Sequence, residues 1–98
     1  MNRSEILHKA ETLVSNDREH VYGPPKRTHE RIADLWRAYL CGIEDAYNPT
    51  PENVICMMIL TKIARLEQTP DHLDTWVDIA GYAAIGGEVA QKEESDGT

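Results

Sequence analysis

The stretch PENVICMMILTKIARLE, residues 51–67, decides the fold, because apolar residues occupy every side of the helix that it predicts. Thr50 before it supplies a hydroxyl N-cap. Proline and glutamate follow at the first two helical positions, where helix geometry and the helix dipole favour them. A helix that is apolar all round is buried between neighbours. We therefore expect this segment to be the central helix of the domain.

Three further helices are predicted around it. Ser4 and Thr69 are candidate N-caps, and Gly42 supplies a C-terminal stop. Between these signals apolar residues recur at helical spacing, and no stretch shows the strict alternation of a half-buried strand. The helices are expected over residues 4–15, 28–40 and 70–89.

The fold class that follows is all-α, with four main helices in antiparallel hairpins arranged like a bundle. On the last helix, the residues expected to pack inward are Leu73, Trp76, Val77, Ala80, Ala83 and Ala84. Residues 1–90 are expected to form a single helical domain, and residues 91–98 a polar, disordered tail. A chain of 98 residues buries only about 60 to 65% of its unfolded surface. We therefore expect oligomerisation, as a homodimer or a higher homo-oligomer, to complete the core.

The amino-acid composition and net charge exclude some classes of function. Hydrophobic residues make up 41% of the chain and charged residues 28%, which is typical of a folded globular domain. The net charge of -7 speaks against sequence-independent DNA or RNA binding, because such binding needs a surface of Lys and Arg that displaces phosphate counterions. The chain has no signal-peptide-like segment and no run of about 18 apolar residues, so we expect a cytoplasmic protein without membrane association.

Charged residues on two adjacent predicted helices form the main candidate site. Lys62 and Arg65 fall on a side of the central helix that also carries apolar residues, so they cannot both reach water unless that side lines a cleft. Asp74 and Asp78 lie one turn apart on the last helix, and Asp71 lies one turn before them. The short connection makes the two helices antiparallel neighbours. The sequence therefore predicts an embedded acid–base cluster near this hairpin.

Three interpretations of this cluster stay open. In the first, it is a structural ion-pair network that sets the register of the hairpin, at a desolvation cost that makes it a weak stabiliser. In the second, Asp71, Asp74 and Asp78 are ligands of Mg²⁺, and the last two are the catalytic residues. Lys62 and Arg65 then bind the substrate phosphates. In the third, the two cations bind a phosphorylated ligand, the aspartates orient them, and nothing is cleaved.

The polar segment NDREHVYGPPKR, residues 16–27, is a second candidate region, because an ordered loop of this length invites a functional interpretation. Tyr22 is a candidate to stack on a base, Gly23 lets backbone approach a ligand, and Arg18 is a candidate phosphate contact. In the alternative interpretation, Tyr22 packs under the loop and Gly23 only shapes the turn into the next helix.

A family resemblance is carried by four segments, which read DREHVYGPP, THERIADLWRAYL, PENVICMMILTKIARL and DHLDTWVDIAGYAA. With them the chain resembles a small all-helical domain family found widely in bacteriophages and prophages, over residues 10–88. That family is distantly similar to the MazG-like all-α nucleotide pyrophosphohydrolases. The resemblance implies a small-molecule nucleotide as the partner and the cytoplasm of an infected or lysogenic bacterium as the location.

MazG-like enzymes cleave a nucleoside triphosphate to the monophosphate and pyrophosphate. They use Mg²⁺ held by an ExxE motif on one helix and an ExxD motif on a following helix. Here only the second motif has a counterpart, in the pair Asp71 and Asp74 or the pair Asp74 and Asp78. The central helix carries Lys62 and Arg65 where the first acidic pair is sought. The function that the resemblance implies is Mg²⁺-dependent hydrolysis of a nucleoside triphosphate.

Two alternatives stay open beside hydrolysis. A non-catalytic protein that binds and sequesters a nucleotide, such as one that a host uses to signal defence against phages, needs no metal site. An acidic protein-interaction module that docks on a host factor is suggested by the net charge alone.

Overall fold

The computed structural model describes residues 1–16 and 24–91. Within these ranges the chain forms four α-helices and no strand, so the all-α prediction is confirmed. The helices are α1 (Arg3–Asn16), α3 (Pro25–Cys41), α4 (Pro51–Gln68) and α5 (Leu73–Ala90). None of these described helices combines the length and the hydropathy that a membrane span requires.

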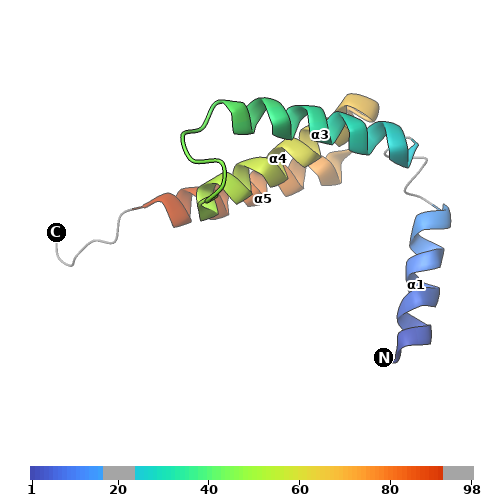
Figure 1. Ribbon diagram of the computed structural model, residues 1–98. Helices are drawn as coiled ribbons and strands as arrows, with labels where there is room; N and C mark the ends of the chain where they lie inside the picture. Colours follow the sequence, from blue (N-terminus) through green and yellow to red (C-terminus); the bar gives the residue numbers. More distant parts are fainter. Residues whose placement is uncertain (17–23, 92–98) are drawn as a thin grey trace.

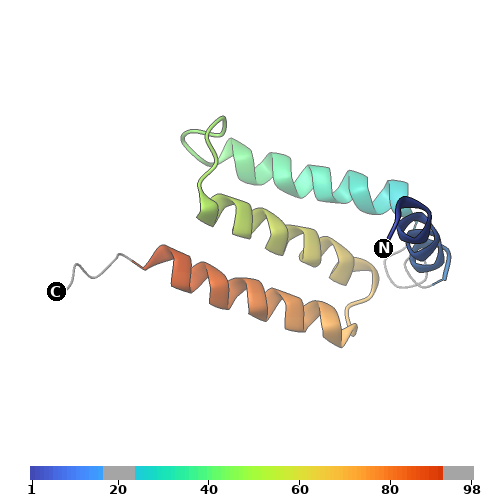
Figure 2. The ribbon, with the colours of Figure 1, turned by 90° about the horizontal axis from the view of Figure 1, so that it is seen from below.

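Helices α3, α4 and α5 lie side by side in one layer, with α4 in the middle (Figure 1, Figure 2). α4 packs against α3 on one side and against α5 on the other, and consecutive helices run antiparallel. In the described part of the chain, α3 and α5 do not pack against each other. The central position of the segment 51–67 is therefore confirmed, whereas three of the expected bundle helices form an open layer instead.

The start of α4 is held by a reciprocal pair of hydrogen bonds. The backbone N–H of Asn53 donates to Thr50 Oγ1 at 3.1 Å, and the N–H of Thr50 donates to the side-chain oxygen of Asn53 at 2.9 Å. This capping box satisfies two backbone groups at the helix N-terminus, and Pro51 occupies the first turn, where no N–H is needed. The predicted start of the central helix is therefore confirmed.

The start of α3 differs from the prediction because of a proline. The helix begins at Pro25, ahead of the predicted start at Thr28, and Thr28 is buried inside its first turns. Proline at the first helical position has its φ angle already set for a helix and lacks only an N–H that would be unpaired there. Gly42 follows the last residue of α3 as its C-cap, as predicted.

The start of α5 also differs. Thr69 was predicted to cap this helix but instead ends α4, where its N–H donates to the Arg65 carbonyl at 3.0 Å. The N-cap of α5 is His72, and the helix begins at Leu73. Asp71 therefore lies in the turn between the helices, and the prediction that placed it on the last helix was wrong.

α1 stands clear of the layer (Figure 1) and makes no backbone contact with it in the described ranges. Its first turn is closed by Asn2, whose side-chain oxygen accepts from the Glu5 N–H at 2.9 Å. Glu5 in return accepts from the Asn2 N–H at 3.2 Å, so Asn2 is the cap and the prediction of Ser4 was wrong. The large apolar side chains of α1 that are more than half exposed are Ile6, Leu7 and Leu13.

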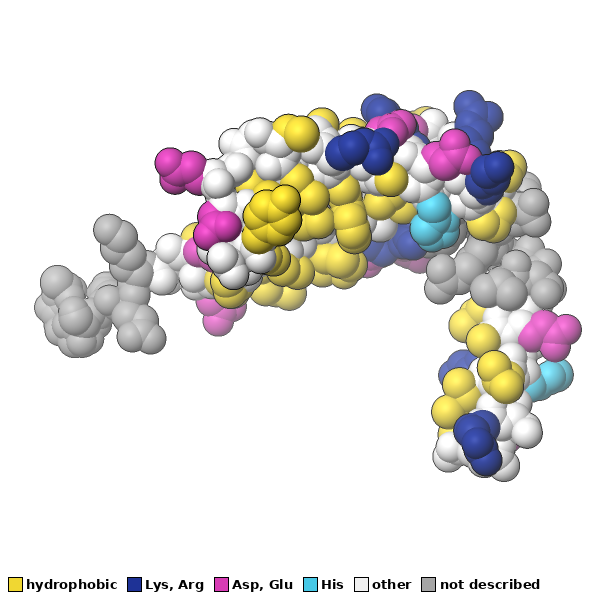
Figure 3. All heavy atoms as spheres, viewed as in Figure 1, with side chains coloured by type: hydrophobic (Ala, Val, Ile, Leu, Met, Phe, Trp, Pro, Cys, Tyr) yellow, Lys and Arg dark blue, Asp and Glu magenta, His cyan; other side chains and the backbone are white. Residues whose placement is uncertain are grey.

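The hydrophobic core of the layer is small, and hydrophobic side chains lie open across the layer and on α1 (Figure 3). Trp36 joins α3 to α4 with its indole N–H, which donates to the Met57 carbonyl at 2.9 Å and to the Thr61 hydroxyl at 3.2 Å. The buried hydrophobic residues of the described ranges are Ile32, Ala64 and Leu66.

The side of α5 that faces α4 is not the predicted one. Thr75 is buried there, and Ile79, Tyr82 and Gly86 are partly buried. A Cβ atom on Gly86 would lie 3.3 Å from Ile55 Cγ2, so the close approach of the two helices favours glycine. The residues predicted to pack inward are all exposed, namely Leu73, Trp76, Val77, Ala80, Ala83 and Ala84. The prediction failed because α5 carries apolar or small residues on most of its sides, so periodicity does not say which side meets α4.

Replacing Thr50 with alanine removes the hydroxyl acceptor of the capping box. We expect the free energy of unfolding to fall by about 1 kcal/mol, as for other lost N-caps. Urea denaturation followed by circular dichroism measures the change. Thr50→Ser keeps the hydroxyl and should retain most of the stability, whereas equal losses in both variants would contradict the capping role.

Candidate functional site

A groove between α4 and α5 collects part of the predicted charge cluster. Its volume is about 370 Å³, and it is open toward solvent. The residues that line it are Lys62, Val77, Asp78, Gly81, Tyr82 and Ile85. The groove therefore combines a cation, an acid and an aromatic ring with aliphatic walls.

The ion pair between Lys62 and Asp78 joins the two helices at this groove. Lys62 Nζ lies 3.0 Å from Asp78 Oδ2. The lysine side chain is only 14% exposed, whereas the aspartate side chain is 48% exposed. The aliphatic stem of the lysine packs along the helices while its amine meets the carboxylate. The prediction of an embedded cation that faces an acid across the hairpin is confirmed for this pair.

Two further residues of the predicted cluster lie one helical turn from this pair. Arg65 follows Lys62 on α4 and is partly buried. Asp74 precedes Asp78 on α5 and is exposed. Neither lines the groove itself, so each would contact a ligand only where that ligand extends beyond the groove toward the turn between the helices.

A cluster of three metal ligands does not occur within residues 1–16 and 24–91, since no three His, Cys, Asp or Glu residues are placed to hold one ion. Asp71, Asp74 and Asp78 thus do not form such a group. Two carboxylates one turn apart can still bind Mg²⁺ when substrate oxygens and water complete its coordination. The predicted ligand contacts that fall outside the described residues, and so stay predictions, are Arg18, Tyr22 and Gly23.

Tyr82 is a lining residue that was not among the predicted site residues. It lies one turn after Asp78 and is partly buried between the helices. A Cβ atom on the neighbouring Gly81 would meet no heavy atom within 4 Å, so the groove is open beside the ring. The available signal was the spacing of four residues between Asp78 and Tyr82, which puts both on one side of a helix.

Residues 5–90, which contain this groove, match a family described as a domain of unknown function, DUF6378. The chain belongs to this family. It is 51% identical to the "Gene 55 protein" of Mycobacterium phage L5 over 80 residues, which cover 82% of the chain and 49% of that protein. It is 39% identical to the "Gene 55 protein" of Mycobacterium phage D29 over 79 residues, which cover 80% of the chain and 48% of that protein. The chain spans about half the length of these curated relatives.

These phage relatives confirm the predicted resemblance to a phage domain family. No solved structure matches this DUF6378 chain. The description of the family and the names of these relatives state no activity.

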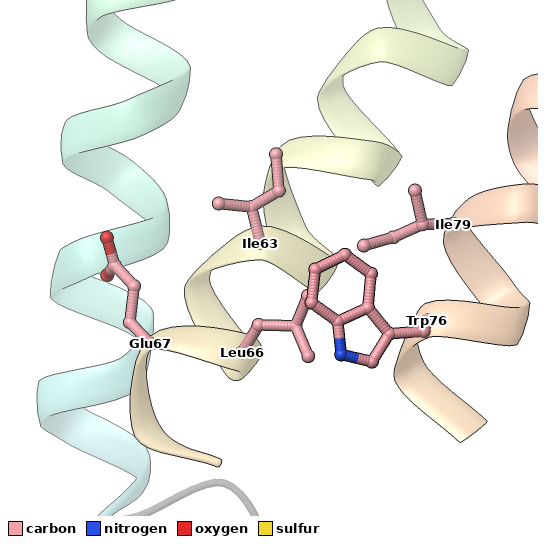
Figure 4. Close-up of a pocket in the computed structure, with 5 residues that line it drawn as sticks. All are labelled: Ile63, Leu66, Glu67, Trp76 and Ile79. Atoms are coloured by element: carbon pink, nitrogen blue, oxygen red, sulfur yellow. The ribbon is translucent and has the colours of Figure 1, made fainter. Parts of the chain in front are cut away.

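A second hollow of this DUF6378 domain is apolar and has a volume of about 380 Å³. Figure 4 shows Trp76 reaching from α5 over Leu66 of α4, with Ile63 and Ile79 beside the ring. The indole N–H donates to the Pro70 carbonyl at 2.8 Å, although Trp76 is 52% exposed. Of the residues that line this hollow, Glu67 alone is charged, so it offers no contact for a phosphate.

A third hollow lies between α3 and α4 and is strongly polar, with a volume of about 410 Å³. Arg31 donates to both carboxylate oxygens of Glu67, at 2.8 and 2.9 Å. These hydrogen bonds lower the pKa of Glu67 below its ordinary value and raise the pKa of Arg31. Both side chains are well exposed, so this ion pair contributes little to the stability of the fold. Glu30 and Asp34, which also line it, are exposed as predicted.

Breaking the groove ion pair tests how firmly Lys62 is held. Asp78→Asn leaves the lysine amine largely buried without its carboxylate, and we expect a loss of about 1 kcal/mol in the free energy of unfolding, since half exposure of Asp78 limits the effect. Asp34→Asn is the matched control, because its pair with Arg37 lies in the open, and should cost less than about 0.5 kcal/mol. Urea denaturation of both variants gives the comparison. Equal losses in the free energy of unfolding would mean that the carboxylate of Asp78 does not stabilise the buried Lys62 amine.

Proposed function

We propose that the groove between α4 and α5 binds a nucleotide, with its phosphates at Lys62 and its base beside Tyr82. The observation that carries the proposal is the embedded ammonium of Lys62 in a groove that also presents an aromatic ring. A lysine already ordered by packing and an ion pair loses little further conformational freedom when it binds a phosphate. A tyrosine ring that lines an open groove suits stacking on a base.

The acids beside the groove indicate which form of nucleotide fits. Asp78 lies against Lys62, and Asp74 lies one turn away. A bare triphosphate would be repelled by these carboxylates and by a chain of net charge -7. Mg²⁺ commonly binds one or two protein carboxylates together with substrate phosphates, and so removes this repulsion. The proposed ligand is therefore a magnesium nucleotide, with Arg65 as a further phosphate contact toward the turn.

The leading function on this basis is hydrolysis of a nucleoside triphosphate to the monophosphate and pyrophosphate, as in the MazG-like enzymes. Water adds across the anhydride between the α- and β-phosphates, the α-phosphate gaining the hydroxyl and pyrophosphate leaving. When bound, Mg²⁺ would neutralise the phosphate charge. Lys62 and Arg65 would hold the phosphates, and Asp74 and Asp78 would hold the ion. The phage relatives support a site of action in the cytoplasm of an infected bacterium.

The second candidate is a protein that binds and sequesters a nucleotide without cleaving it, for instance one that signals host defence. One observation favours it, because Asp78 is the acid that lines the groove and no three metal ligands cluster in the described ranges. In this function Asp78 orients Lys62, and the ligand leaves unchanged.

Nucleotide binding and hydrolysis can be measured on the same samples. We expect the chain to bind at least one of the common ribo- or deoxyribonucleoside triphosphates in the presence of Mg²⁺, by isothermal titration calorimetry, and to release pyrophosphate from it. Lys62→Met should weaken binding by about tenfold or more, because a charge-assisted phosphate contact is lost. Asp78→Asn should abolish pyrophosphate release while binding persists.

Two exposed residues provide controls. Lys26→Met on α3 removes a charge of the same kind away from the groove. Tyr82→Ala removes the proposed stacking ring and should weaken binding, whereas Tyr47→Ala removes an exposed tyrosine outside the groove and should not. Binding without pyrophosphate release would exclude the enzyme and leave the sequestering function. If no triphosphate binds, or if Lys26→Met weakens binding as much as Lys62→Met, the groove is not the nucleotide site.

A further inference from the structure

One side of α5 faces away from α4 and has no partner within the described chain. At 3.6 residues per turn it lies opposite Thr75, Ile79 and Tyr82, which face α4. We call it the outer side of α5, and it consists of Leu73, Val77, Ala80, Ala84 and Gly87. All five residues are exposed, with Leu73 at 71% and Val77 at 59%. These residues include four of those that the sequence predicted to be packed.

The spacing along the outer side alternates between four and three residues. This is the heptad spacing of helices that pack along their length at a small crossing angle. Leu73 and Val77 are large and lie near the N-terminus of α5, whereas Ala84 and Gly87 are small and lie near its C-terminus. Ala80 is at the centre. The outer side is therefore graded from large to small along the helix.

We propose that a second copy of this chain covers the outer side of α5 with its own α5, in an antiparallel, two-fold symmetric pair. About a two-fold axis at Ala80, Leu73 of each copy meets the Gly87 position of the other, and Val77 meets Ala84. At both ends of the helix pair, a large side chain of one copy therefore packs against a small residue of the other. An isologous interface requires this kind of self-complementarity. A parallel pair would put Leu73 on Leu73 and Gly87 on Gly87, and would leave a gap at one end.

The charge arrangement agrees with this pairing. Glu88 is the acid in the last turn of α5 and borders the outer side. The antiparallel pair brings it to the N-terminal end of the other α5, at the level of His72, where the helix dipole favours negative charge.

α1 is the other helix with exposed apolar side chains, which are Ile6, Leu7 and Leu13. Coverage of the outer side by α1 instead of a second copy is an outcome that a cysteine placed at Leu7 distinguishes.

A single cysteine tests the two-fold axis. In a chain whose exposed cysteines are replaced, Cys41→Ser and Cys56→Ser, we expect Ala80→Cys to form a disulfide-linked dimer under mild oxidation, because the two positions meet across the axis. Ala33→Cys on the exposed side of α3 is the matched control and should stay monomeric on a non-reducing gel. Light scattering of the unmodified chain should give about twice 11.1 kDa.

A size exchange tests the antiparallel direction. A Cβ atom on Gly87 meets no heavy atom within 4 Å in the chain itself, so Gly87→Leu should leave the fold intact. It should weaken the dimer by about tenfold or more, because it overfills the space opposite Leu73. Adding Leu73→Ala exchanges the large and the small residue and should restore most of the affinity. Sedimentation equilibrium measures the three dissociation constants, and circular dichroism confirms the fold.

Val77 lies on the outer side and also lines the groove, but none of these variants changes a residue of the groove, so the outcomes are distinguishable from those for nucleotide binding. A monomer at high micromolar concentration overturns the proposal. A dimer whose dissociation constant is unchanged by Gly87→Leu also overturns it. The same holds if Ala80→Cys forms a disulfide only with a cysteine that replaces Leu7 of α1. Crosslinking at Ala80 together with rescue by Leu73→Ala establishes it.

Discussion

The structure depends on α4 being packed on two opposite sides. Toward α3 it accepts the indole N–H of Trp36, and toward α5 it comes so close that Gly86 lies under Ile55. A helix with apolar residues all round can hold two neighbours, and α3 and α5 consequently never meet within the described ranges. The result is a layer rather than a bundle, and a layer of three helices has little interior.

The same constraint places the candidate site. Because α5 packs through Thr75, Ile79 and Tyr82, the side that carries Asp78 borders the groove toward α4. Lys62 lies on the side of α4 that faces α5. Its amine reaches the groove between the two helices and meets the Asp78 carboxylate there. An embedded cation at an open groove is costly to maintain unless it is paired. The ion pair with Asp78 explains how the partly buried charge of Lys62 is tolerated. The proposed function of that charge is to bind a phosphate.

Much of this could be predicted from the sequence where the signals are local. The Thr50 cap, the central helix and the pairing of Lys62 with Asp78 follow from spacing and chain connection. The orientation of α5 could not be predicted, because a helix with several apolar sides has several equally good inward sides. Residues of the outer side of α5 that were predicted to be buried are exposed in the structure. In the proposed dimer, a second copy of the chain covers them. Tyr82 was missed for the same reason, since its role depends on that orientation.

In the proposed dimer, another copy of the chain completes the open layer. Thermal unfolding followed by circular dichroism, over a roughly hundredfold range of protein concentration, tests it most directly, because a dimer of folded chains is stabilised by mass action. For a dimer, we expect the unfolding midpoint to rise steadily with protein concentration. A midpoint that stays constant over the whole range would contradict it.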